Sequence, residues 1–127
     1  MSVRLMLCGL LCAALFASCF GAAMAHSRLA PADEYFGRSK MSILEINNRI
    51  RDCAFRANHG VRPSRLLGDA QRTQDAMDDW SRKYPGDPWL SHYWWRLAKL
   101  YALMPSATAH ARESIALVRF HQFDRSK

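Results

Sequence analysis

The sequence predicts an all-α fold of about four antiparallel helices, arranged as two helical hairpins behind an N-terminal signal peptide. Four segments after residue 38 carry apolar residues at three- and four-residue steps, which is the period of an amphipathic helix. No segment of useful length alternates apolar and polar residues, as a half-buried strand does. Because the loops between the segments are short, consecutive helices should be antiparallel neighbours, closed as a small bundle or stacked as a short solenoid.

Residues 1–25 have the composition of a signal peptide. Arg4 supplies a positive charge, an almost unbroken apolar run follows it, and Ala23 and Ala25 occupy the two positions where a signal peptidase needs small residues. Cleavage after Ala25 would release residues 26–127 as a single domain into the periplasm or the medium. We therefore expect an exported protein of the bacterial cell envelope.

Two other fates of this segment stay open. Cys19 follows a Leu-Phe-Ala-Ser sequence that resembles the lipoprotein box, in which the cysteine is acylated and becomes the first residue. Alternatively, residues 5–25 remain as an uncleaved anchor, since they are just long enough to cross a bilayer of about 30 Å. Either alternative would hold the domain at a membrane.

Cys53 is the one cysteine beyond the signal peptide, so a chain cut after Ala25 cannot form an internal disulfide. It shares a predicted apolar helix face with Ile46 and Ile50. This placement favours a buried thiol that acts as a small core hydrophobe. A disulfide-linked dimer through Cys53 is the alternative.

Each of the four predicted helices is bounded by residues that start or stop helices. The helices cover residues 39–58, 64–83, 88–104 and 107–122. Asp33, Tyr35 and Phe36 are expected to extend the first helix by a turn or two. Asp87 is expected to cap the third helix and Ser106 the fourth.

The fourth predicted helix has apolar residues on two sides. Ala111, Ile115 and Val118 form one stripe along it, while Leu117 and Phe120 lie away from that stripe. Such a helix either packs on both sides or uses one apolar side for association.

A turn and the helix after it carry a family resemblance. The residues concerned are Lys83-Tyr84-Pro85-Gly86-Asp87-Pro88-Trp89, followed by Tyr93, Trp94, Leu97, Ala98 and Tyr101. This stretch resembles the boundary between helix pairs in tetratricopeptide-type proteins of the bacterial cell envelope, where a Tyr-Pro-x-x-Pro turn precedes a Leu-small-x-x-Tyr pattern. The resemblance covers about a third of the chain after residue 25 and implies a scaffold that binds a protein or peptide rather than an enzyme. It departs at Met104-Pro105-Ser106, and no clear second copy occurs at a period near 34 residues.

The chain is basic, with 18 Lys+Arg against 11 Asp+Glu and a formal net charge of +7. This charge favours an acidic protein or an anionic component of the envelope as partner, and it is compatible with peripheral membrane contact. Nucleic acid is disfavoured by the export signal, by the lack of basic runs and by the lack of a nucleic-acid motif. Motifs for zinc proteases, redox cysteines, haem, serine hydrolases and phosphate loops are also missing, so we expect no cofactor and no bound metal.

His92, Trp95, Arg96 and Lys99 form the candidate partner-binding surface. At about 100° per residue, they lie away from the core stripe of the third predicted helix. Tryptophan and arginine often dominate binding energy at interfaces. We therefore expect these side chains to contact an acidic partner or an anionic lipid; the alternative is that Trp95 packs beneath the first or fourth helix.

These observations predict an exported, non-catalytic helical domain that mediates protein–protein or envelope-surface interaction. Two other classes stay open. A small periplasmic metal-binding protein or enzyme would need a site assembled between helices, and Asp75, Asp78 and Asp79 with a distant histidine are the raw material for it. A structural homodimer, joined through Cys53 or through the two-sided fourth helix, is the other class.

Overall fold

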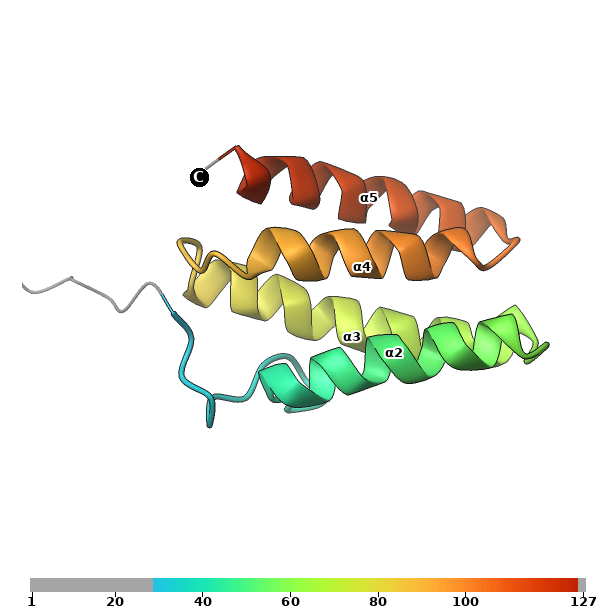
Figure 1. Ribbon diagram of the computed structural model, residues 1–127, viewed down its shortest axis with the longest axis horizontal. Coiled ribbons are helices and arrows are strands. Elements are labelled where there is room, and N and C mark those ends of the chain that lie inside the picture. The colour runs from blue at the N-terminus through green and yellow to red at the C-terminus, as the bar shows by residue number, and fades with distance from the viewer. Residues whose placement is uncertain (1–28, 126–127) are drawn as a thin grey trace, which may run out of the picture.

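The computed structural model describes residues 29–125, and the regular structure in this part of the chain is helical apart from one isolated β-bridge. The helices, labelled as in Figure 1, are α2 (Ile43–Asn58), α3 (Pro63–Lys83), α4 (Leu90–Ala102) and α5 (Ala107–Asp124). They form two antiparallel hairpins that pack as a small bundle, which confirms the predicted all-α class (Figure 1).

The predicted signal peptide lies outside the described residues, and so do Ala23, Ala25 and the alternative acylation site Cys19. Among the helices between residues 29 and 125, none is both long and apolar enough to cross a membrane.

Serine side chains define the starts of α2 and α5. The Ser42 hydroxyl accepts the backbone N–H of Glu45 at 3.2 Å, so α2 begins at Ile43 rather than at residue 39. The Ser106 hydroxyl accepts the backbone N–H of Ala109 at 3.1 Å, which confirms Ser106 as the cap of the last helix.

Residues 29–42 form no helix, so the predicted helical extension through Asp33, Tyr35 and Phe36 is wrong. Instead, Phe36 and Met41 exchange two backbone hydrogen bonds of 2.9 Å across a tight turn. Both side chains are buried in the core. The segment before α2 is therefore part of the packed domain.

Gly37 lets this turn lie directly on α3. Its φ is +68°, and a Cβ added there would lie 2.8 Å from the Cα of Ala76. The N–H of Gly37 donates to Asp79 at 2.9 Å, and the N–H of Arg38 donates to Asp75 at 2.9 Å. Two carboxylates of α3 thus satisfy backbone groups that a helix would have paired internally.

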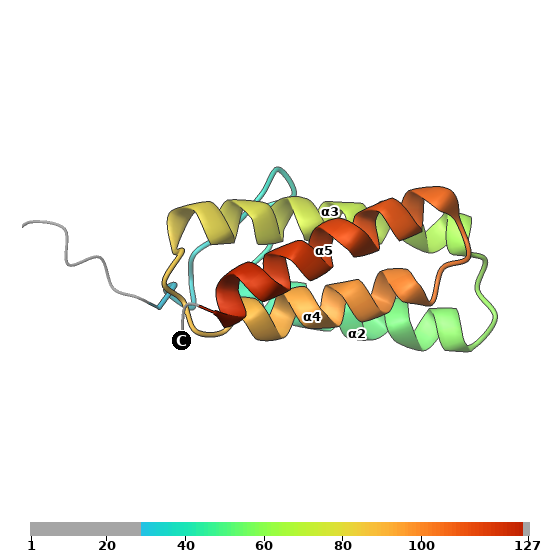
Figure 2. The same ribbon diagram turned by 90° about the horizontal axis from the view of Figure 1, so that it is seen from above.

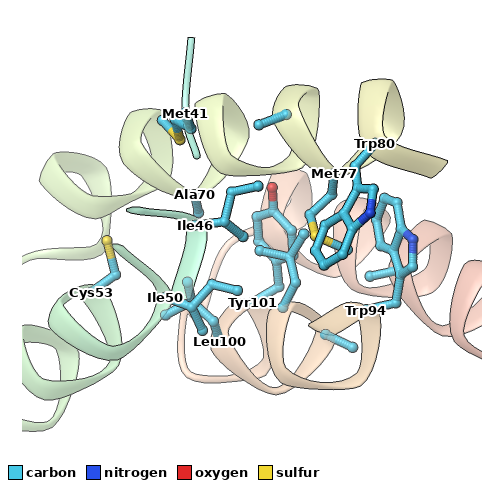
Figure 3. Close-up of a cluster of buried hydrophobic side chains, with 14 of the residues drawn as sticks. Met41, Ile46, Ile50, Cys53, Ala70, Met77, Trp80, Trp94, Leu100 and Tyr101 are labelled. Atoms are coloured by element: carbon cyan, nitrogen blue, oxygen red, sulfur yellow. The ribbon is translucent and has the colours of Figure 1, made fainter. Parts of the chain in front are cut away.

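The core between α2, α3 and α4 contains three large aromatic side chains that carry a polar atom (Figure 3). Trp80, Trp94 and Tyr101 are all fully buried. Trp94 donates its indole N–H to the Ser81 hydroxyl at 2.9 Å, and the Tyr101 hydroxyl donates to Gln74 at 2.9 Å. Each ring therefore brings its polar atom into the core together with a partner.

Asp87 connects the N-terminal segment, α3 and α4. It is only 4% exposed, and one of its oxygens accepts the Trp80 indole N–H at 3.1 Å and the Ala30 backbone N–H at 2.9 Å. The other oxygen accepts the backbone N–H of Trp89 at 3.0 Å, and α4 starts at the next residue, Leu90. Asp87 thus holds three donors, but the prediction that it caps the helix is wrong: a turn at residues 88–89 separates it from α4, whose N-cap is Trp89 with no side-chain capping hydrogen bond, and α4 begins two residues after the predicted start.

α5 packs along α4 (Figure 2). The buried residues of α5 recur every seven positions and are Ala109, Ala116 and Phe123. Of the two predicted apolar sides, the stripe of Ala111, Ile115 and Val118 is exposed, with Val118 67% exposed, while Leu117 and Phe120 are partly buried against the core. The distance between packed helices depends on the side chains at the contact, so alanines allow α5 to approach α4 closely, which larger residues there would prevent.

Candidate functional site

The predicted binding residues lie on the outer side of α4, where Trp95 contacts α5 and Lys99 lies over the Trp95 ring. The Trp95 ring centroid lies 5.2 Å from that of Phe120, and Lys99 Nζ lies 5.9 Å from the Trp95 ring centroid. One side of Trp95 therefore packs on α5, the fourth predicted helix, in agreement with the alternative prediction for this residue. The side chain is still 43% exposed, so the rest of the ring is available to a partner.

Arg96 points the other way, toward α2. Its guanidinium donates to the Asn47 side chain of α2 and lies 5.7 Å from the Tyr93 ring centroid. His92 is exposed and meets the rings of Tyr93 and Trp89 edge-on, at centroid distances of 5.3 Å and 6.2 Å. The structure thus places the four predicted residues on one helix, with Trp95 in contact with α5 and Arg96 in contact with α2.

A hollow of about 370 Å³ lies between α2 and α4, and we call it the basic groove. The residues lining it are Ile50, Arg51, Ala54, Asn58, Arg96, Lys99, Leu100 and Leu103. Buried Ile50 and Leu100 supply an apolar floor, and none of the described lining residues is acidic. Arg51, Arg96 and Lys99 form no ion pair with any residue in 29–125.

A second hollow of about 460 Å³ continues the seam between α2 and α4 toward the N-terminal segment, and we call it the apolar groove. Its lining residues are Leu29, Ala30, Ala32, Ile43, Leu44, Asn47, Asp87, Trp89 and Tyr93. Its one charged group is the Asp87 carboxylate, which is saturated by three donors. Asn47 lines the apolar groove and Arg96 lines the basic groove, so their hydrogen bond separates the two.

α2 and α4 lie side by side on one side of the bundle, with α3 behind them (Figures 1 and 2). Their outward side, together with Trp89 just before α4, carries five exposed large apolar residues and four basic or imidazole groups. We call it the α2–α4 face: Leu44, Arg51, Phe55, Trp89, His92, Trp95, Arg96, Lys99 and Leu103. Both grooves open onto this face.

Carboxylates elsewhere in the described chain serve as internal clamps. Seven Lys and Arg side chains within 29–125 form ion pairs, and most of their partners are on α3. Asp69, for example, lies 3.4 Å from both Arg49 and Arg56 and so ties α2 to α3. The cations of the basic groove differ from these seven because no described acid neutralises them.

A third hollow, of about 560 Å³, is lined by two of the three aspartates that the alternative metal or catalytic site would need. It lies where the 36–41 turn meets α3 and α5, and Asp75 and Asp78 line it together with Arg38, Arg72 and Arg112. Charges of both signs therefore compensate one another there. Within residues 29–125, no group of three or more His, Cys, Asp or Glu side chains is placed to hold a metal ion.

Cys53 is free and fully buried on the inner side of α2. Burial raises the pKa of its thiol to about 11, with a smaller contribution from Asp69. A protonated, enclosed thiol is a poor nucleophile. A second chain could form a disulfide with Cys53 only after the core had opened.

Sequence reasoning missed the half of this face that comes from α2. Leu44, Arg51 and Phe55 share one side of that helix, opposite the buried Ile50 and Cys53. Their spacing of seven and four residues was a signal available in the sequence. What was absent was any indication that this side of α2 would lie beside α4.

The chain matches no protein-family model, and comparisons with curated proteins and with solved structures find no significant match. The resemblance to tetratricopeptide-type proteins therefore stays a prediction, and function has to be argued from the α2–α4 face itself.

Proposed function

We propose that this chain is a non-catalytic binding module whose α2–α4 face takes an anionic partner, either an acidic protein or an anionic component of the cell envelope. The observation that carries the proposal is the basic groove, in which Arg51, Arg96 and Lys99 surround an apolar floor with no described acid among them. Like charges held close together repel, and an anionic ligand would relieve that repulsion.

The contrast with the other two arginines at the middle and end of α2, Arg49 and Arg56, supports this choice. Asp69 neutralises Arg49 and Arg56 although both arginines are on a neighbouring helix. α4 contains no acidic residue, and the two acids of α2 are paired within their own helix, Glu45 with Arg49 at 3.3 Å and Asp52 with Arg56 at 3.4 Å. A surface that leaves its cations unpaired while adjacent cations are paired is complementary to a negatively charged partner.

The aromatic residues also support the proposal that this face binds a partner. Trp95 and Trp89 are exposed on the same face, Trp95 beside Lys99 and Trp89 at the apolar groove, and tryptophan is enriched among residues that dominate binding energy. The signal peptide expected at residues 1–25 would deliver the domain to the periplasm or the medium, so we propose partners there and not nucleic acid.

Binding of poly-L-glutamate, followed by tryptophan fluorescence at low and physiological salt, tests the proposal. The double variant Arg51→Gln/Lys99→Gln should weaken binding about 10-fold relative to wild type and reduce its salt dependence. Arg65→Gln/Arg125→Gln removes the same charge from two exposed sites off the face, and it should change affinity by less than about 2-fold.

Equal losses in the two double variants would show that only the net charge of the chain matters, and the proposal would then be wrong. Circular dichroism of both variants checks that the helices are intact.

A further inference from the structure

We infer that the anionic partner of the α2–α4 face is the surface of a lipid bilayer. This inference rests on the proposed function and names the partner. It is carried by the placement of the exposed apolar side chains, which extend well beyond the two grooves.

Phe55 and Trp95 show that a ligand confined to the two grooves would leave exposed apolar side chains of the face uncovered. Phe55 is 60% exposed, and neither residue is among those that line the basic or the apolar groove. A peptide seated in the seam would leave both rings in water. A broad, flat partner would cover them together with Leu44 and Leu103, which flank the same seam.

The apolar residues are spread along both helices, and the cations lie between them. Leu44 and Phe55 are about 16 Å apart along α2, and Trp89 and Leu103 are about 20 Å apart along α4, at about 1.5 Å per residue. Arg51 lies between the first pair along the sequence. Trp95, Arg96 and Lys99 lie between the second pair.

This arrangement is chemically suited to the boundary between headgroups and acyl chains. Tryptophan rings favour that depth, and leucine and phenylalanine can enter the acyl region. Lysine and arginine extend their charged ends to lipid phosphates while their methylene stems stay among apolar groups. The acids of α2, Glu45 and Asp52, lie at the edge of the face, about 60–100° around the helix from Leu44 and Phe55, and each is paired with an arginine, Arg49 and Arg56 respectively.

Tryptophan fluorescence gives a direct test, because all four tryptophans of the chain lie within residues 80–95. Trp80 and Trp94 are fully buried, whereas Trp89 and Trp95 are exposed on the face. The full chain is mixed with vesicles of phosphatidylcholine and phosphatidylglycerol at 3:1, with and without brominated acyl chains. Quenching by bromine then reports insertion of the face and not of residues 1–25.

We expect brominated vesicles to quench the emission of the wild-type chain. Trp89→Phe/Trp95→Phe should remove most of the quenchable emission. Arg51→Gln/Lys99→Gln should lower the partition coefficient of the quenched state about 25-fold, at about 5-fold for each cation, while Arg65→Gln/Arg125→Gln should change it by less than about 2-fold. Pure phosphatidylcholine vesicles should quench far more weakly.

The other outcomes distinguish the bilayer inference from the proposed function. Absence of bromine quenching, with poly-L-glutamate binding still dependent on Arg51 and Lys99, overturns the bilayer inference and leaves the proposed function standing with an acidic protein as partner. Sedimentation with vesicles without quenching also overturns it, because contact then occurs elsewhere on the chain. If the face variants and the control variants behave alike toward both probes, the proposed function fails as well.

Discussion

Adjacent aspartates on α3 illustrate how strongly the immediate surroundings decide what a carboxylate does. Asp79 accepts the N–H of Gly37 at 2.9 Å and pairs with Lys83 at 3.4 Å. Burial raises the pKa of Asp79, but these donors outweigh it and hold the pKa below its ordinary value. For Asp78, burial dominates and raises the pKa. One oxygen of Asp78 is enclosed without a hydrogen bond, although Arg119 lies 3.5 Å away.

The same substitution at these two positions should therefore have different effects. Asp79→Asn should cost about 1–2 kcal/mol at pH 7, because the partly buried N–H of Gly37 loses a charged acceptor. Asp78→Asn should lie within about 0.5 kcal/mol of wild type or be slightly more stable, because a poorly solvated charge disappears. Urea unfolding at pH 7 measures both.

The pH dependence of the Asp79→Asn effect provides a further check. A folded-state pKa below the unfolded value stabilises the protein above the unfolded pKa, and that contribution disappears as the pH falls through the folded value. The cost of Asp79→Asn should therefore shrink below about pH 4. A cost that stays constant down to pH 2.5 would contradict the role assigned to this carboxylate.

The raised pKa of Cys53 leads to a second prediction about a single residue. The thiol pKa rises from 9.0 to about 11 on folding, so between these values the unfolded chain releases a proton that the folded chain retains. Ionisation then favours the unfolded state, and stability falls as the pH rises through this window. Wild type should lose up to about 2–3 kcal/mol relative to Cys53→Ala between pH 8 and pH 11. Parallel pH profiles of the two proteins would show that the thiol is not enclosed.

At the scale of the element, α5 shows that small residues can define a packed face. Ala116 is fully buried against the bundle, whereas Ala111 on the same helix is exposed. Ala116→Leu should destabilise the fold by about 1–3 kcal/mol, because the added atoms have no space between the helices. Ala111→Leu has nearly the same helix propensity and should be neutral within about 0.5 kcal/mol in thermal unfolding. Similar effects at both positions would contradict the observed orientation of α5.

The errors in sequence interpretation also belong to this scale. The helical period and the capping residues were sufficient to place all four helices of the described region, because these signals are local. The orientation of α5 depends on residues distant in the sequence. Ile115 and Val118 are larger apolar residues, but Ala109 and Ala116 are the ones buried, because small residues allow close contact with α4. Likewise, the extension before α2 failed because Gly37 meets Asp79, forty-two positions away.

The candidate site was predictable only in part, for a related reason. Trp95 and Lys99 stand away from the core stripe of α4, so the periodicity of one helix was enough to find them. Arg51 belongs to the same surface only because α2 lies beside α4 in space. No pattern within α2 reports that neighbour, which the structure shows through the Asn47–Arg96 hydrogen bond and the grooves lined by both helices.

Across the whole molecule, charge is divided between two uses. On α3, carboxylates neutralise arginines and accept backbone donors, and these contacts join the N-terminal turn, α2 and α5 to one helix. On the α2–α4 face, the cations have no described acidic partner. The first arrangement stabilises the bundle internally. The second leaves one side of the bundle free to attract an anionic surface without breaking any of the internal ion pairs.

The N-terminal segment determines whether this bundle holds together as a unit. Phe36 is fully buried and stacks on Trp80 with ring centroids 5.8 Å apart, whereas neighbouring Tyr35 is mostly exposed. Phe36→Ala should cost about 3–5 kcal/mol, a large share of the 5–15 kcal/mol that stabilises a domain of this size. Tyr35→Ala removes a ring of similar size and should cost less than about 1 kcal/mol. Chemical unfolding of both variants decides whether the domain begins before α2: equal, small costs would mean that the helices alone form the folded unit, whereas the expected difference makes residues 29–42 an integral part of it.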